Sequence, residues 1–241
     1  MRSKIIKVKT KSKNYEVHIG INLISKLRNI LKTNKLSFSK CLIVIDSKIP
    51  KKFRTILLGN LKNQKIYTLN FNANEKNKSN LSIDKIHNIL FKNNFYREDC
   101  IISFGGGITG DVVGYAASTY KRGIKFINIP STLLAQVDSS TGGKTGINNK
   151  FGKNLIGSFY QPDLVISDIN LLRTLPKREI ICGYAEILKS SLIDSKKNFI
   201  FVQAVINFYY LIMINCSWFF GQNILFIIDT FHYPFKMKAM R

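Results

Sequence analysis

Three glycines between an apolar run and a segment of small residues are the clearest candidates for chemistry. Gly105, Gly107 and Gly110 follow the apolar run 100–104 with the spacing G-x-G-x-x-G, and Asp111 comes next. The apolar run is typical of a buried strand, and the segment VVGYAAS after Asp111 is typical of a closely packed helix. Glycine lets the backbone approach an anion, and the free N–H groups and dipole of a helix N-terminus favour negative charge. The pattern therefore predicts a phosphate site, and with it a nucleotide.

The same spacing matches the dinucleotide fingerprint, but an ordinary Rossmann domain also carries an acidic residue about 20 positions further on. Here the next expected strand, KFINIP, ends at Pro130. An acidic residue does end an earlier strand, since Asp46 follows the run 41–45. At the carboxyl end of a strand in an α/β sheet, its carboxylate is well placed for a ribose. An N-cap for the next helix is an equally good local explanation.

A second polar cluster follows the glycine turn. Asp138 lies in AQVDSS, Lys144 in TGGKTG, and Lys153 and Asn154 in GKN. Two lysines, a carboxylate and many glycines suit a polar, anionic substrate that is held close to the backbone. The segment GGKT is not a P-loop, because Asp138 occupies the position of the first glycine of that motif.

The composition indicates a basic chain with enough apolar residues for a core. Of the 241 residues 45% are hydrophobic, and the formal net charge is +23. Such a charge is typical of proteins that bind nucleic acid, anionic membranes or acidic ligands. The lysines are scattered among Asn, Ile and Phe, which favours a solvated basic surface. We therefore expect no dedicated nucleic-acid partner.

Cysteines, one histidine and the first residues set further limits. The four cysteines have no paired spacing, which indicates neither a zinc knuckle nor a disulfide scaffold. His18 lies inside an expected strand, where a packed side chain is the commoner explanation. The first ten residues, MRSKIIKVKT, lack the long apolar segment of a signal peptide, which points to the cytoplasm.

Strands and helices are expected to alternate along the chain. Residues 4–9 and 15–19 alternate apolar and polar side chains around a KSKN turn, which predicts a hairpin. The later alternation predicts a parallel sheet covered on both faces, with a nucleotide at the strand ends. The expected strands are 41–45, 65–71, 100–104, 125–130 and 164–168, and the expected helices are 21–31, 50–61, 82–91 and a segment after Asp111.

Six ordered motifs resemble 3-dehydroquinate synthases: GGGITGDVVGYAAS, Y-K-RGI, IPSTLLAQVDSSTGGKTGIN, GKNLIGSFYQP, TLPKRE and GYAEILK. The similarity is dense from about Leu42 to Asp194. These are NAD- and metal-dependent enzymes of the shikimate pathway. The resemblance implies an α/β fold with an N-terminal parallel-sheet, NAD-binding domain at 1–175. It also implies the start of a helical metal and substrate domain at 176–195.

The resemblance also implies a reaction. A phosphorylated seven-carbon sugar acid (DAHP) is converted to 3-dehydroquinate with release of phosphate. NAD oxidises a ring alcohol, the neighbouring C–H becomes acidic, phosphate is eliminated, NADH returns the hydride, and the ring opens and closes as an aldol. Zinc or cobalt polarises the alcohol as a Lewis acid.

Roles are implied residue by residue for the cofactor. The family similarity favours the ribose role for Asp46. The loop NANEKNKSN resembles a G-E-x-x-K element that contacts NAD, with Asn74 in place of glycine, and Asn tolerates a positive φ better than other non-glycine residues. Ser131 stands where the family usually has threonine. The residues implied to contact NAD are Asp46, Glu75, Lys78, Gly106, Gly107, Ile108, Thr109, Gly110, Asp111, Ser131, Thr132, Lys144, Lys153, Leu171, Thr174 and Leu175.

A second implied set contacts the substrate and the metal. In the family, the arginine that matches Arg122 reaches into a partner subunit, so a homodimer is expected. Glu186 and Lys189 share a helical face at i, i+3, and a surface ion pair is the commoner explanation for such spacing. The family makes the glutamate a metal ligand and lets the lysine contact the substrate. The implied residues are Arg122, Asp138, Lys144, Asn154, Glu186 and Lys189.

The resemblance ends where the tail 196–241 begins, and the segment 199–228 contains no charged residue. This hydrophobic tail could contact or span a membrane, form a buried helix, result from a shifted reading frame, or be a diverged cap. The family's helical domain supplies two histidine ligands to the metal, whereas the tail offers only His232. A catalytic zinc normally has three protein ligands, and only Glu186 can be named here. The alternative function is a non-catalytic NAD- or phosphate-binding remnant, with or without a membrane tether.

Overall fold

The computed structural model describes residues 3–194 and is built on a seven-stranded sheet with the order β1-β2-β9-β6-β5-β3-β4. β1 and β2 form the expected antiparallel hairpin, and the other neighbouring strands are parallel. The hairpin joins the main sheet because β2 pairs with β9. The strands are β1 (Lys4–Val8), β2 (Tyr15–Gly20), β3 (Lys40–Asp46), β4 (Lys65–Phe71), β5 (Cys100–Gly105), β6 (Lys125–Pro130) and β9 (Leu164–Asp168).

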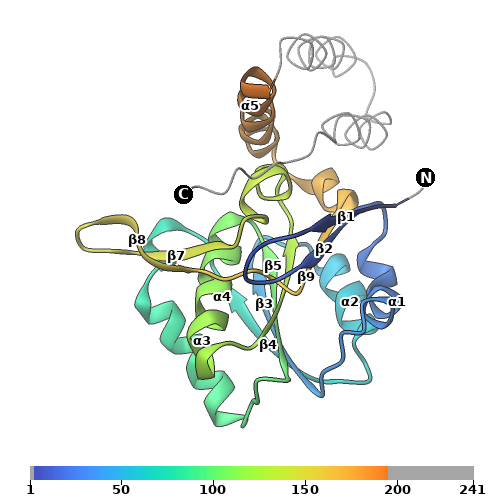
Figure 1. The fold of residues 1–241 in the computed structure, drawn as a ribbon, viewed down its shortest axis with the longest axis vertical. Coiled ribbons are helices and arrows are strands. Elements are labelled where there is room, and N and C mark those ends of the chain that lie inside the picture. Colours follow the sequence, from blue (N-terminus) through green and yellow to red (C-terminus); the bar gives the residue numbers. More distant parts are fainter. Residues whose placement is uncertain (1–2, 195–241) are drawn as a thin grey trace. The chain divides into compact units, whose positions relative to one another are not determined.

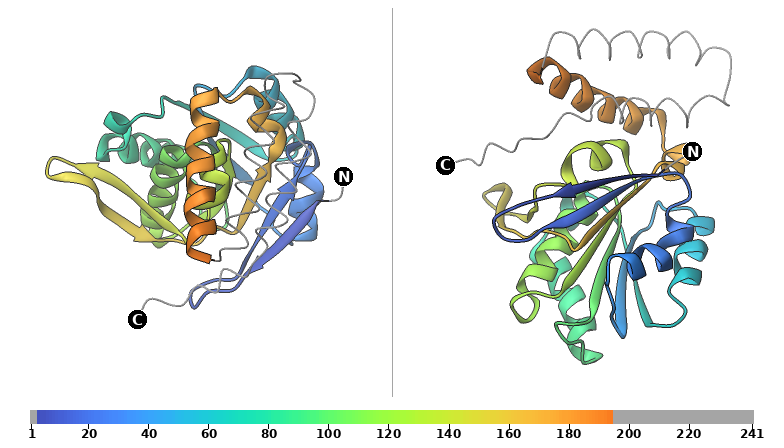
Figure 2. Two further views of the ribbon diagram at one scale, coloured as in Figure 1. Left: turned by 90° about the horizontal axis from the view of Figure 1, so that it is seen from above. Right: turned by 45° about the vertical axis from the view of Figure 1, so that its right-hand side comes forward.

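Helices cover both faces of this sheet, as Figures 1 and 2 show. α1 (Leu27–Thr33) and α2 (Lys51–Asn60) lie on one face, and α3 (Asn80–Lys92) and α4 (Gly107–Thr119) lie on the other. Successive side chains of β3 point to opposite faces, so Ile43 packs with α1 and α2 while Val44 packs with α3 and α4. The predicted α/β fold with a parallel sheet is confirmed.

Short helical turns connect several of these elements. The helix expected at 21–31 is divided, because a 3-10 turn at η1 (Ile24–Lys26) precedes α1. The other turns are η2 (Glu75–Asn77), η3 (Tyr120–Arg122), the π-helical η4 (Ala135–Ser139) and η5 (Ile169–Thr174).

A second, two-stranded sheet was not predicted. β7 (Lys144–Asn149) and β8 (Gly152–Phe159) form an antiparallel hairpin that extends beyond the main sheet (Figure 1). Its strands approach closely where Gly146 pairs with Gly157, because a Cβ at Gly146 would lie 2.6 Å from the Ile156 carbonyl oxygen. The hairpin packs on α4, where a Cβ at Gly114 would lie 2.5 Å from Thr145 Cγ2. The small residues of α4 therefore allow this close contact.

The chain divides into two compact units, residues 1–183 and 184–241, and the boundary falls within α5 (Lys177–Asp194). The predicted domain limits at 175 and 195 stay predictions. Within residues 3–194, no helix has the length and apolarity needed to cross a membrane. The segment 199–228 and the rest of the tail 196–241 lie outside the described residues.

Candidate functional site

The centre of the candidate site is the carboxyl edge of β3 and β5. After β3 the chain goes to β4 at the end of the sheet, whereas β5 pairs with the other side of β3 and is followed by β6. The order of the strands therefore reverses between β3 and β5, and ligands of open α/β sheets bind at such a switch point. Asp46 ends β3 and Gly105 ends β5 at this place.

At the glycine turn, no side chain of the turn itself covers the backbone N–H groups at the start of α4. Gly106 is the N-cap of α4, and no side chain caps it. A Cβ at Gly106 would lie 3.1 Å from Thr132 Cγ2, and one at Gly107 would lie 3.0 Å from Ser139 Oγ. Because no side chain projects from the turn, an anion can approach the first N–H groups of α4. Of the predicted cofactor residues in α4, Thr109 is buried, whereas Ile108 and Gly110 are partly exposed.

The segment after β6 lies against the same turn. The Ser131 N–H donates to the Gly105 carbonyl at 2.8 Å. Thr132 Oγ1 accepts a hydrogen bond from the Ala135 N–H at 3.2 Å, so this hydroxyl caps the helical turn that follows. The structure therefore brings Ser131 and Thr132 beside the glycine turn, and their predicted contact with NAD stays a prediction.

Asp46 faces the glycine turn from β3. A Cβ at Gly105 would lie 3.0 Å from the Asp46 Cβ. The Asp46 Oδ1 accepts a hydrogen bond from the Lys48 N–H at 3.0 Å, and the N-cap of α2 is Pro50. The alternative role of Asp46 as an N-cap is therefore wrong. Burial raises the pKa of the Asp46 carboxyl, while the Lys48 N–H and the charges of Lys48 and Arg54 act in the opposite direction.

The raised pKa of Asp46 predicts a pH-dependent gain in stability from Asp46→Asn. A carboxyl whose pKa is higher in the folded state stabilises the fold below its ordinary value of 3.8, and this contribution is lost as pH rises through the raised pKa. Asparagine keeps the Oδ1 acceptor and does not ionise. The free energy of unfolding of the variant, relative to that of the parent, should therefore rise between pH 4 and pH 7. Urea unfolding at both pH values measures it, and an opposite trend would contradict the burial argument.

Lys78 joins three segments of the site. Its Nζ lies 2.5 Å from Asp111 Oδ2 in α4 and 2.5 Å from Asn154 Oδ1 in β8. Lys78 is only 5% exposed, and Asn154 has a φ of 59°. Burial raises the pKa of Asp111, against the opposing effect of the Lys78 ammonium. The structure thus brings together three residues that were predicted separately.

The Glu75 loop differs from its prediction in one respect. Asn74 has a φ of −151°, so the positive φ considered for this position is wrong. The Asn74 side chain instead accepts a hydrogen bond from the Asn77 N–H at 2.9 Å and caps η2. Glu75 is exposed, and its Oε2 lies 2.8 Å from Asn148 Nδ2 and 3.6 Å from Lys153 Nζ. Asn148 was not predicted.

The other predicted residues differ in their distance from this cluster. Asp138 is exposed on η4, and its charge contributes to the raised pKa of Asp111, so it lies near the cluster. Lys144 is exposed at the start of β7. Arg122 is exposed just before β6, which places it at the opposite edge of the sheet from Asp46. Leu171 in η5 is buried in the core, and the Thr174 hydroxyl donates to its carbonyl at 3.3 Å. Leu175, which follows η5, is partly exposed.

In the second compact unit, Glu186 and Lys189 form an ion pair across one turn of α5. The Glu186 side chain is 18% exposed and the Lys189 side chain 61%. Within residues 3–194, no three His, Cys, Asp or Glu side chains are grouped so that they could hold a metal ion. Residues 3–194 therefore do not by themselves form a complete site for the implied zinc or cobalt, and Glu186 is one candidate ligand among them. His232 lies outside the described residues.

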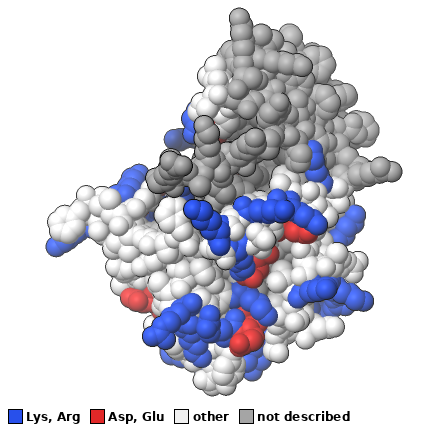
Figure 3. Space-filling view, viewed as in Figure 1, with Lys and Arg blue, Asp and Glu red and all other residues white. Residues whose placement is uncertain are grey.

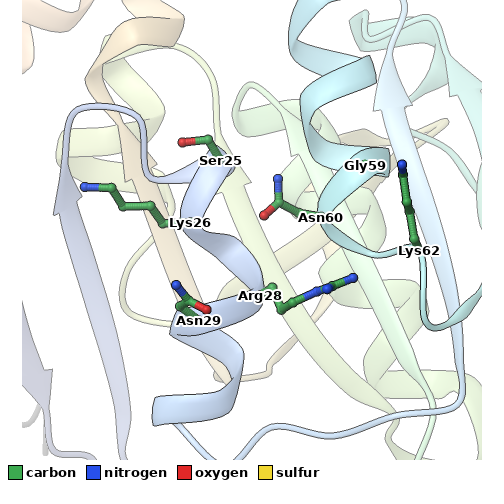
Figure 4. A pocket seen from close by; sticks show the side chains of 7 residues that line it. All are labelled: Ser25, Lys26, Arg28, Asn29, Gly59, Asn60 and Lys62. Atoms are coloured by element: carbon green, nitrogen blue, oxygen red, sulfur yellow. The ribbon is translucent and has the colours of Figure 1, made fainter.

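A cavity of about 350 Å³ lies between η1 with α1 and the end of α2 (Figure 4). Its lining includes Lys26, Arg28 and Lys62 and no acidic side chain. The end of α2 precedes β4, so the cavity lies at the amino edge of the sheet, away from Asp46. Lys62 follows the C-terminus of α2, where a cation complements the exposed carbonyls, whereas Lys26 and Arg28 lie at the N-terminal end of α1.

Basic side chains are spread over the face of the molecule shown in Figure 3. Lys and Arg form several separate groups there, with Asp and Glu between some of them. The predicted absence of a dedicated nucleic-acid partner stays a prediction.

Comparison with known structures defines the class of the fold. 2-Deoxy-scyllo-inosose synthase complexed with carbaglucose-6-phosphate, NAD+ and Co2+ is 26% identical, with a TM-score of 0.73 over 78% of this chain and 51% of that one. 2-Epi-5-epi-valiolone synthase from Streptomyces hygroscopicus subsp. jinggangensis 5008, with NAD+ and Zn2+ bound, is 28% identical, with a TM-score of 0.68 over 77% and 51%. The described part of the chain has the α/β fold of sugar-phosphate cyclases.

Sequence comparison is more specific. Residues 68–182 match the family described as 3-dehydroquinate synthase N-terminal. The 3-dehydroquinate synthase of Pelagibacter ubique (strain HTCC1062) is 58% identical over 197 residues, which are 82% of this chain and 54% of that protein. The chain belongs to the 3-dehydroquinate synthase family. It spans about half the length of the curated relatives that it matches.

Proposed function

We propose that this chain is the NAD-binding part of a 3-dehydroquinate synthase. The observation that supports this most is the position of Asp46 beside the bare N-terminus of α4 at the switch point. A carboxylate suits the ribose hydroxyls of the dinucleotide, and the helix N-terminus suits its pyrophosphate. Two proteins of similar structure hold NAD+. When bound, NAD supplies hydride acceptance and return.

The residues of this chain fit that cofactor. Gly105 and Gly106 leave the approach to α4 open, and Asp46 lies beside them. Lys78 and Glu75 lie on a loop that is bonded to the β7–β8 hairpin. They would hold the cofactor at its side, while Lys144 and Lys153 add positive charge at the exposed face of the hairpin. These contacts bind and orient the cofactor, and no chemical step is attributed to them.

Calorimetry with NAD and NADP tests the proposal. We expect saturable binding of one NAD per chain and at least roughly tenfold weaker binding of NADP, because the 2′-phosphate would meet the Asp46 carboxylate. Asp46→Asn should narrow this difference. Absence of NAD binding, or equal affinity for both cofactors, would overturn the proposal.

The substrate proposed for the whole enzyme is DAHP, a phosphorylated seven-carbon sugar acid, which is converted to 3-dehydroquinate and phosphate. Asp138, Lys144 and Asn154 would contact it from this part of the chain. In the other unit, Glu186 would be a ligand of zinc or cobalt, and Lys189 would contact the substrate. Lys144 is exposed, so its ammonium is accessible to an anion. We also propose a cytoplasmic location for the enzyme.

We further propose a homodimer. Arg122 lies at the opposite edge of the sheet from Asp46, so it suits the site of a partner copy better than its own. The hairpin β7–β8 also exposes Leu155 and Phe159, at 62% and 79%, and exposed apolar side chains of this size suit a protein interface. Light scattering of the purified chain decides between a monomer of 27.5 kDa and a dimer of twice that mass.

A further inference from the structure

Asn148 in β7 uses its backbone and both halves of its side chain in hydrogen bonds. Its N–H donates to the Lys78 carbonyl at 2.8 Å. Its Nδ2 donates to Glu75 Oε2 at 2.8 Å and to the Glu75 carbonyl at 3.2 Å. Its Oδ1 accepts from the Asn154 N–H at 2.9 Å. One residue therefore joins the loop of η2 to strand β8.

These partners include the residues whose placement most needs support. Glu75 and Lys78 lie on a short polar loop more than 60 residues before Asn148 in the chain. Asn154 has a left-handed backbone conformation, with a φ of 59°. Asparagine adopts this conformation more readily than other non-glycine residues, and hydrogen bonds then fix its orientation. Asn154 is held by Asn148 at its N–H and by Lys78 at its Oδ1.

We propose that Asn148 is a positioning residue for the cofactor site, which holds Glu75 and Lys78 on one side and Asn154 on the other. This inference rests on the proposed function, because Glu75 and Lys78 are the residues expected to contact NAD. Asn148 is assigned no direct contact with the cofactor in this proposal. It acts through the Glu75 carboxylate and through the backbone of Lys78 and Asn154.

Electrostatics agree with this geometry. The hydrogen bond from Asn148 is the largest cause that lowers the pKa of Glu75, followed among the lowering causes by the charges of Lys153 and Lys78. Burial acts in the opposite direction. The pKa of Glu75 is therefore a direct readout of the Asn148 contact, and it can be measured without the cofactor.

The experiment compares Asn148→Ala and Asn148→Asp with Asn149→Ala. Asn149 neighbours Asn148, and its Oδ1 accepts from the Phe151 and Gly152 N–H groups in the hairpin turn, so its replacement tests a purely structural effect. Asn148→Ala should weaken NAD binding about tenfold, because a hydrogen bond to a charged group is lost. Asn149→Ala should change the affinity for NAD less than threefold.

Two measurements without NAD separate positioning from stability. By NMR titration, Asn148→Ala should raise the pKa of Glu75. Asn148→Asp keeps the acceptor for Asn154 and places a second carboxylate beside Glu75, so it should raise this pKa and keep the Asn154 amide slow to exchange. A double-mutant cycle gives a third test. The loss of free energy of unfolding in the double variant Glu75→Ala/Asn148→Ala should be smaller than the sum of the losses in the two single variants.

The outcomes are distinguishable. If the parent chain binds no NAD, the proposed function fails and this inference fails with it. If the parent binds NAD, while Asn148→Ala or Asn148→Asp binds it equally well with the pKa of Glu75 unchanged, only the role of Asn148 is overturned. Weakened binding with a raised pKa of Glu75, and no such change in Asn149→Ala, supports the role.

Discussion

Replacement of Gly106 by valine is expected to abolish NAD binding and to leave the fold intact. Gly106 has a φ of −77° and a ψ of −169°, a conformation that any L-residue adopts. The added Cβ would lie 3.1 Å from Thr132 Cγ2, so only a small shift of that side chain is required. The valine methyl groups would instead occupy the approach to the first N–H groups of α4. We expect at least a hundredfold loss of affinity in calorimetry.

The matched control is Gly59→Val. A Cβ at Gly59 meets no atom within 4 Å, and Gly59 lines the cavity between α1 and α2 at the other edge of the sheet. This variant should bind NAD as the parent does. Loss of binding in Gly59→Val with unchanged binding in Gly106→Val would place the cofactor in that cavity and contradict the proposed site.

Purified by itself, the 241-residue chain is expected to release little or no phosphate from the sugar-phosphate substrate, even with NAD and zinc or cobalt. Removal of a hydride from an alcohol requires stabilisation of the developing alkoxide, and a metal contributes several kcal/mol to this. A catalytic zinc normally has three protein ligands. The chain contains only three histidines, and two of them are used within the described fold.

Those two histidines have other partners. His18 is buried, and its Nε2 lies 3.0 Å from Glu16 Oε2 and 3.2 Å from Asn34 Nδ2. His87 Nε2 lies 3.0 Å from the Ala116 carbonyl. A phosphate-release assay measures the activity. Turnover near the usual range of about 1–1000 per second would contradict the expectation. Abolition of that turnover by Glu186→Gln would then identify the glutamate as a metal ligand.

Most of the fold follows from local pattern. β3 and β5 are predictable because they are apolar runs covered on both faces, and the glycine turn after β5 is predictable because it lies between a strand and a helix. The hairpin β7–β8 is not predictable in this way, because its strands are rich in Gly, Asn and Lys. Its strands approach closely where Gly146 pairs with Gly157, and it packs on α4, whose residues lie much earlier in the chain.

In the candidate site, too, some residues are predictable from the local sequence and others are not. Asp46 and residues 105–111 are recognisable because each lies at the end of an apolar run. Asn148 carries no local signal, because one asparagine among several in a polar hairpin is indistinguishable from its neighbours. Its partner Glu75 lies 73 residues earlier in the chain, and the backbone of Lys78 is similarly distant, so these contacts exist only in the folded structure. The positive φ considered for Asn74 was wrong, because its side chain caps η2 and its backbone is extended.

The central claim is that NAD binds at the switch point between β3 and β5. Its most direct measurement is the change in backbone amide NMR signals when NAD is added to the deuterated, ¹⁵N-labelled chain. The claim predicts that the largest changes occur in residues 105–111 and next to Asp46, with saturation at one NAD per chain. Changes confined to the cavity lined by Lys26, Arg28 and Lys62, with the glycine turn unaffected, would contradict it.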